Sequence, residues 1–187
     1  SSYMGKNGTE ESFLNMHGKS PKLLHLATHG FYYTPNRAEN VDYLKGYTDA
    51  MSLSGLVMSG GNAAWLGKQL PKGVLGGILT ANDIARLDLS NTDMVVLSAC
   101  QTGQGKATSE GLYGLQRAFK KAGVGTIVMS LWSVSDKTTS EFMTIFYERL
   151  ADKNNAWNKR KAFEEAKEII RKKHPDPFHW AAFVMLD

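Results

Sequence analysis

The sequence predicts an α/β fold, a three-layer α/β/α sandwich in which helices cover both faces of a mostly parallel sheet. Three observations predict it. Short, continuously apolar runs recur along the chain, helical patterns lie between them, and glycines or capping residues mark the boundaries. Strands that alternate with helices pair in parallel, and runs without polar alternation indicate strands that are buried on both faces.

Four apolar runs are expected to form the strands. They cover residues 23–27, 55–58, 94–99 and 126–131. The apolar tail over residues 179–186 follows the turn signal Pro175-Asp176-Pro177, so it could add a last strand.

Helices are expected between these strands and after them. The patterns cover residues 10–17, 81–87, 111–122, 135–150 and 156–172. Thr80 and Asp83 have the spacing of a capping box, and Gly123 is a natural stop for the third helix. Ser135 and Asp136 can cap the fourth. The stretches 32–51 and 59–74, rich in Gly, Asn and Tyr, are expected to be long loops.

One domain is expected, because 187 residues with 42% hydrophobic content suffice for a single sizeable core. The polar residues 1–9 are interpreted as a disordered linker or an expression remnant, which leaves residues 10–187 as the folded domain.

Composition and charge exclude several classes of function. A net charge of +4 gives little support to nucleic-acid binding, and the late cluster of Lys and Arg, interrupted by Glu, is interpreted as a solvated helix face. One cysteine excludes an internal disulfide and a multi-thiolate zinc site. No apolar run reaches the roughly 20 residues that span a bilayer, and the first residues lack a signal-peptide pattern. Cytoplasmic residence without membrane association is therefore the default expectation.

Two chemically reactive side chains follow two of the predicted strands. Thr28-His29-Gly30 comes directly after the first, and the only thiol, Cys100, comes directly after the third. Because the carboxyl ends of parallel strands share one edge of a sheet, an imidazole and a thiol are expected at the same rim. A cysteine nucleophile needs a base and donors for the oxyanion, so we nominate His29 as base and the N–H groups of Gly30 and Cys100 as the oxyanion hole.

Six segments, in order, resemble the CHAT family, whose members are relatives of caspases and separases. They are LHLATHGFY, SGLVMSGGN, VVLSACQTG, GLYGLQRAFKKAG, SLWSVSD and WAAFVM. The resemblance implies a caspase-like fold, a His-Cys dyad at His29 and Cys100, and an N-terminal region that often consists of tetratricopeptide repeats. The implied function is that of a cysteine endopeptidase acting on protein or peptide substrates through a thioester, with no metal or organic cofactor.

The substrate pocket is expected from the same resemblance. Compared with the caspase signature Q-A-C-x-G, Ser98 takes the place of Gln and one extra residue precedes Gly103, which argues against caspase-type Asp specificity. The segment with Trp132, Ser133 and Asp136 is similar to a pocket-lining segment of separases. An inward Asp136 would select a basic P1 residue; as an alternative of equal weight, Asp136 is simply a helix cap.

Residue spacing argues against two other functions, a metal site and a phosphate-binding loop. His25 and His29 would lie about 13 Å apart along a strand, too far to share a metal, so His25 is expected to pack in the core with a hydrogen-bond partner. The run Gly103-Gln104-Gly105-Lys106 lacks the first Gly and the Ser or Thr of a phosphate loop. Two rivals stay open: a catalytically silent caspase-like scaffold or partner-binding module, and a flavodoxin-like ligand binder.

Overall fold

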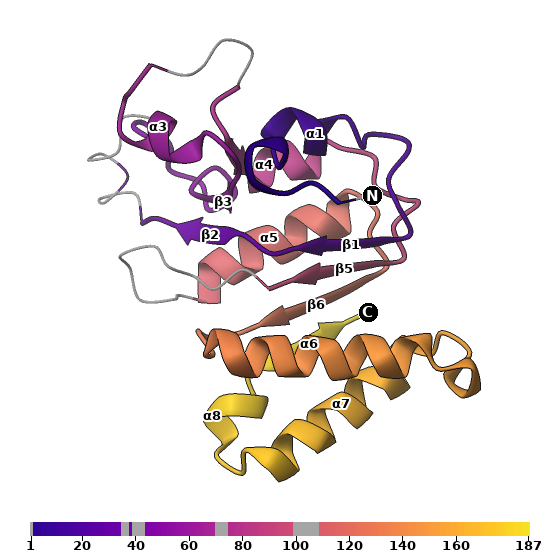
Figure 1. The fold of residues 1–187 in the computed structure, drawn as a ribbon. Coiled ribbons are helices and arrows are strands. Elements are labelled where there is room, and N and C mark those ends of the chain that lie inside the picture. The colour runs from indigo at the N-terminus through magenta and orange to yellow at the C-terminus, as the bar shows by residue number, and fades with distance from the viewer. Residues whose placement is uncertain (1, 35–37, 39–43, 70–74, 99–108) are drawn as a thin grey trace. The chain divides into compact units, whose positions relative to one another are not determined.

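The computed structural model describes residues 2–34, 38, 44–69, 75–98 and 109–187. The chain divides into two compact units, Ser1–Ile127 and Val128–Asp187. Each unit contains both helices and strands, which confirms the predicted α/β class (Figure 1).

The first unit contains a pair of parallel strands. These are β1 (Leu23–Leu26) and β5 (Met94–Leu97), and their register places Leu26 opposite Leu97 (Figure 1). All of β5 is buried, as its continuous apolar run predicts. The same prediction is wrong for β1, because His25 is exposed between buried leucines, the alternation of a strand with one outward-facing side.

The first unit also contains a three-stranded antiparallel sheet in the order β2-β3-β4. Its strands are β2 (His29–Tyr32), β3 (Ser54–Val57) and β4 (Ile78–Thr80). The sequence predicts only β3. The other two escape sequence reasoning because β2 follows β1 after two residues and β4, three residues long, runs directly into a helix.

The helices of the first unit are short, apart from the last. They are the 3₁₀ turn η1 (Gly5–Asn7) and the α-helices α1 (Glu10–Leu14), α3 (Gly61–Trp65), α4 (Ala81–Ala85) and α5 (Ser109–Lys121). The capping box of α4 is confirmed: the Thr80 hydroxyl accepts from the Asp83 amide at 3.2 Å, and the Thr80 amide donates to the Asp83 carboxylate at 3.0 Å. Gly123 follows α5 with φ +96°, the left-handed conformation that ends a helix. Two expectations are wrong: α1 stops short of residue 17, and α3 lies where a loop is expected.

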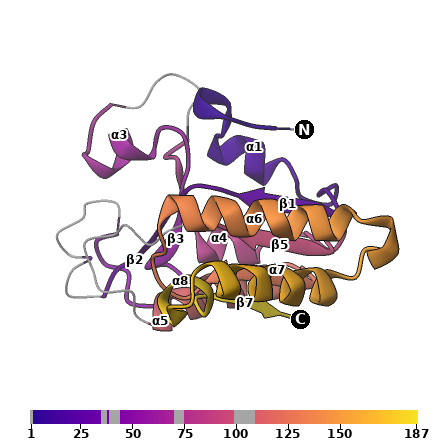
Figure 2. The same cartoon turned by 60° about the horizontal axis from the view of Figure 1, so that its bottom comes forward.

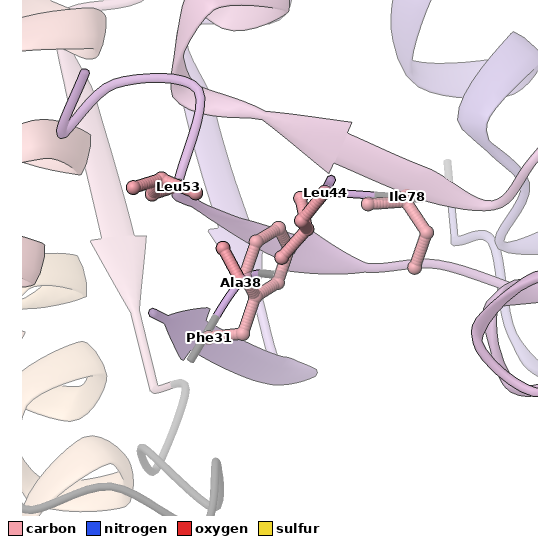
Figure 3. Packing of buried hydrophobic residues seen from close by; sticks show 5 residues of the cluster. All are labelled: Phe31, Ala38, Leu44, Leu53 and Ile78. Atoms are coloured by element: carbon pink, nitrogen blue, oxygen red, sulfur yellow. The ribbon is translucent and has the colours of Figure 1, made fainter. Parts of the chain in front are cut away.

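Buried apolar side chains close the space beside the antiparallel sheet. Figure 3 shows this cluster, which brings together Phe31 from β2, Ile78 from β4, and Ala38, Leu44 and Leu53 from the intervening chain. The Phe31 ring is 4% exposed and meets the indole of Trp65 edge-on, with ring centroids 5.2 Å apart. The cluster holds β2, and with it the start of that strand, against the rest of the unit.

The second unit packs two long helices against each other (Figure 2). Its elements are α6 (Asp136–Ala151), the 3₁₀ turn η2 (Lys153–Asn155), α7 (Lys159–Lys173), α8 (Pro177–Trp180) and β7 (Phe183–Leu186), while β6 (Thr126–Ser130) runs across the boundary between the units. The core is aromatic: the ring of Phe142 stacks on Phe183 with centroids 4.0 Å apart and meets Phe163 edge-on.

The predicted helices over 135–150 and 156–172 correspond to α6 and α7 within a few residues. The expected last strand is shorter than the tail over residues 179–186. Pro177 begins α8, whose first turn is capped by Asp176 accepting from the Phe178 amide at 2.9 Å, so β7 starts only at Phe183. The basic residues of α7 are largely paired with carboxylates, for example Arg171 with Glu168, as a solvated face predicts.

Candidate functional site

His29 is the first residue of β2 and lies opposite Val57 of β3. Its side chain is exposed. The residue before it, Thr28, donates a hydrogen bond from its hydroxyl to the carbonyl oxygen of Val57. The chain is therefore tied to β3 just before His29, through the Thr28 hydroxyl, and from His29 onward, through the pairing of β2 with β3. A neighbouring strand thus fixes the backbone that carries the imidazole.

The backbone amide of Gly30 points away from β3. In an antiparallel pair, hydrogen-bonded and non-hydrogen-bonded positions alternate. The Tyr33 amide donates to the carbonyl oxygen of Leu53 at 2.8 Å, so the hydrogen-bonded positions of β2 have odd numbers. Gly30, opposite Leu56, is at a non-bonded position and its N–H is directed to the other edge of β2. This orientation is compatible with the predicted role of that N–H as an oxyanion donor.

Ser98 continues the parallel pair by one residue beyond β5. Its amide donates to the carbonyl oxygen of Leu26 at 3.1 Å, and its hydroxyl oxygen lies 2.8 Å from Nε2 of His25. Cys100, the predicted nucleophile and second oxyanion donor, lies outside the described residues. The structure thus describes one member of the predicted dyad, His29, and the strand that leads to the other.

His25 differs from its expected place in the core. It has a hydrogen-bond partner, as expected, and the structure identifies that partner as Ser98, but the residue is exposed instead of lying in the core. Desolvation by the surrounding chain nevertheless lowers the pKa of His25 below its ordinary value, which favours the neutral imidazole. A neutral ring can either donate to or accept from the Ser98 hydroxyl.

The remaining predicted pocket residues lie in the second unit, whereas Ser98 belongs to the first. Trp132 is half-buried, and its indole N–H donates to the carbonyl oxygen of Phe178 at 2.9 Å. Ser133 and Asp136 are exposed. Asp136 is the first residue of α6, and the cap is the hydroxyl of Ser135, which accepts from the Thr138 amide at 3.2 Å.

Three polar contacts are not foreseen by the sequence reasoning. The bonds Thr28–Val57 and His25–Ser98 join segments far apart in the chain, although both Thr28 and Ser98 lie within two residues of a predicted catalytic side chain. That proximity is the signal that could have found them. The third contact joins His174 Nε2 to the Glu141 carboxylate at 2.9 Å and lowers the pKa of Glu141.

The part of the chain that the structure describes contains neither a metal-binding cluster nor a helix that could span a membrane. Within it, no three His, Cys, Asp or Glu side chains gather in a way that could hold a metal ion. Nor does any described helix combine the length and apolar character needed to cross a bilayer.

The chain is similar to one known protein family and to two longer proteins. The family model of the CHAT domain matches residues 1–187. A stretch of 111 residues is 33% identical to Tetratricopeptide repeat protein 28 of Mus musculus and 32% identical to the protein of the same name from Homo sapiens. The stretch covers 58% of this chain but only 4% of each relative, so the chain spans a small fraction of the length of these proteins.

Proposed function

The chain belongs to the CHAT domain family, which is caspase-like, and on this premise we propose that it is a cysteine endopeptidase with Cys100 as nucleophile and His29 as general base and acid. The hydrolysed bond is a peptide bond of a protein or peptide substrate. No metal or organic cofactor takes part in the proposed reaction.

The observation that carries the proposal is the register of β1 and β5. Leu26 and Leu97 are direct partners at the ends of these parallel strands. His29 comes three positions after Leu26, and Cys100 comes three positions after Leu97. The imidazole and the thiol therefore follow two paired strand ends at the same distance in sequence, which supports a dyad across this pair of strands.

In the proposed mechanism, His29 accepts the thiol proton of Cys100, and the thiolate attacks the carbonyl carbon of the scissile bond. The N–H groups of Gly30 and Cys100 stabilise the resulting oxyanion. The tetrahedral intermediate collapses as the C–N bond breaks, and His29 gives its proton to the leaving amine. Water, deprotonated by His29, then attacks the thioester and releases the carboxylic acid and the free thiol.

Covalent labelling with a peptide acyloxymethyl ketone tests the dyad. The chain has a single cysteine, so a mass increase reports on Cys100 without ambiguity. The wild type should be labelled, Cys100→Ala should not, and His29→Ala should react at least about a hundredfold more slowly, as expected for the loss of a general base. Lys22→Ala, which changes an exposed side chain at the opposite end of β1, is the control. Equal rates for wild type and His29→Ala would refute the dyad and leave the silent scaffold.

We further propose that Asp136 selects a basic P1 residue. Its position as the first residue of α6 leaves the carboxylate exposed, and Ser135 already provides the cap, so the helix does not require the Asp136 side chain for that purpose. Cleavage of matched peptides with Arg, Met or Asp at P1 should favour Arg, and Asp136→Ala should remove the preference. An unchanged preference in the variant would refute the assignment.

The proposed setting is a longer, cytoplasmic protein with a regulatory repeat region. The relatives are named for tetratricopeptide repeats, and the matched stretch is a small part of each, which supports a parent chain in which such repeats accompany the peptidase. A single free cysteine fits a reducing compartment. Peptide-library cleavage by the longest natural chain would report both substrate preference and the effect of the repeats.

A further inference from the structure

The hydrogen bond between His25 and Ser98 joins the two strands that lead to the predicted dyad. His25 belongs to β1 and lies opposite Val96 in the register, while Ser98 follows the last residue of β5. Nε2 of the ring and the Ser98 hydroxyl oxygen are 2.8 Å apart. Because the Ser98 amide also bonds to the carbonyl oxygen of Leu26, this residue is held through both its backbone and its side chain.

Ser98 is the last described residue before the nucleophile, two positions before Cys100. A serine side chain that finds no partner in a neighbouring strand exchanges among rotamers. With the imidazole as partner, one rotamer is selected. The contact therefore restrains the side chain as well as the backbone of the residue that stands two positions before the predicted nucleophile.

We propose that His25 is a positioning residue of the peptidase, which through its hydrogen bond to Ser98 fixes the chain that presents Cys100. The assignment rests on the proposed function for its catalytic meaning. His25 does not exchange protons with the substrate in this scheme. That role belongs to His29, which is carried by the next strand.

The test uses the whole chain and the peptide acyloxymethyl ketone, with inactivation resolved into its limiting rate, kinact, and its half-saturation concentration. His25→Phe keeps the ring and removes the nitrogens, whereas Ser98→Ala removes the hydroxyl. Each should lower kinact about three- to tenfold, the rate ratio that corresponds to the net free energy of one hydrogen bond, and leave half-saturation unchanged. The pH dependence of the rate should match that of the wild type, because the variants leave both members of the proposed dyad in place.

Conservative variants and a double-mutant cycle separate positioning from general damage. His25→Gln and Ser98→Thr keep a hydrogen-bonding group and should retain kinact within about twofold. His25→Phe combined with Ser98→Ala should be no slower than the slower single variant, since both substitutions remove the same bond between His25 and Ser98. Lys22→Ala is the matched control: it breaks the Lys22–Asp93 ion pair of 3.7 Å between the same two chain segments at their other end, and kinact should not change.

A second readout does not require peptidase activity. Alkylation of the only cysteine by iodoacetamide measures the reactivity of Cys100 directly. His25→Phe and Ser98→Ala should slow it by a common factor of about three to ten, while Lys22→Ala matches the wild type. If the ketone fails to label the wild type yet this pattern persists, the peptidase proposal falls and the positioning role stands. The positioning role would be overturned if both single variants were alkylated at the wild-type rate, or if the double variant showed a rate reduction equal to the product of the two single reductions.

Discussion

Helix α5 approaches β3 so closely that Gly114 leaves no room for a side chain. A methyl group at this position would lie 2.2 Å from the hydroxyl oxygen of Ser54 and 3.2 Å from the carbonyl oxygen of Ala50. Ser54 is fully buried, and its hydroxyl donates to that same carbonyl at 2.7 Å, so it cannot turn away without losing its bond. Gly114→Ala must therefore displace the helix, the strand or the bonded serine.

The expected cost follows from two opposing effects. Alanine in a helix interior stabilises by about 0.8–1 kcal/mol relative to glycine, whereas overpacking a close contact costs about 1–3 kcal/mol. With a contact more than 1 Å shorter than van der Waals distance, we expect the upper part of that range and a net loss of about 1–2 kcal/mol. In a chain of this size each kcal/mol lowers Tm by about 2–4 °C, so thermal unfolding should shift downward by about 2–8 °C.

A second substitution reverses the sign. Ser54→Gly removes the Ser54 oxygen at 2.2 Å and the Ser54 Cβ at 3.2 Å and leaves only the carbonyl oxygen of Ala50 at 3.2 Å, so adding Gly114→Ala to that background should be neutral or stabilising. Tyr113→Ala, on the exposed face of the same helix, is the control and should stay within about 0.5 kcal/mol of the wild type. A Gly114→Ala variant more stable than the wild type, or equally destabilised in both backgrounds, would refute the packing argument.

Three further predictions concern stability. Burial raises the pKa of Glu10, which accepts from the Gly77 amide at 2.8 Å, so this carboxyl contributes stability below its ordinary pKa and loses it as pH rises through the folded value. The Tm of Glu10→Gln minus the Tm of the wild type should therefore increase as pH rises from about 4 to about 7. A difference that stays constant or falls over this range contradicts the argument. Phe142→Ala empties the space beside Phe183 and should cost about 3–5 kcal/mol in urea unfolding, and a loss below about 1 kcal/mol would argue against the stacked core. The side chain of Asn158 caps α7 at 3.0 Å, so Asn158→Ala should lose about 1 kcal/mol in thermal unfolding while Asn158→Asp matches the wild type; equal values for both variants would exclude the cap.

The elements that the sequence predicts well are those with a strong local signal. The strands β1, β3, β5 and β6 coincide with continuous apolar runs, and the capping box before α4 forms as its spacing indicates. The long helices α6 and α7 repeat their apolar residues over several turns, so their existence follows from periodicity.

What the sequence misses depends on contacts between distant segments. His25 belongs to an apolar run, yet its exposure is decided by which side of β1 other elements cover. The short strands β2 and β4 exist because β3 lies between them and offers both edges, a pairing that no local pattern encodes. For the candidate site, the sequence identifies His29 and Cys100 by residue type and place, and the dyad stays a prediction because Cys100 is outside the described residues.

Three of the segments on which the resemblance rests pair with one another in the structure. LHLATHGFY and VVLSACQTG contain all but the first residue of β1 and of β5, which are joined by their parallel register and by the His25–Ser98 bond. LHLATHGFY and SGLVMSGGN contain β2 and β3, joined by their antiparallel register and by the bond from Thr28 to Val57. The first segment is therefore common to both pairs and carries the imidazole at the point where the chain passes from one sheet to the other.

Gly55, in the segment SGLVMSGGN, leaves no room for a larger residue between β2 and β4. A Cβ at Gly55 would lie 2.3 Å from the carbonyl oxygen of Leu79 and 2.8 Å from the ring of Phe31. The first contact is with backbone in β4 and the second with a side chain of β2, so any larger residue pushes apart strands on both sides of β3. Because β2 begins at His29, a change in β3 that touches neither predicted catalytic residue would displace the strand that carries one of them.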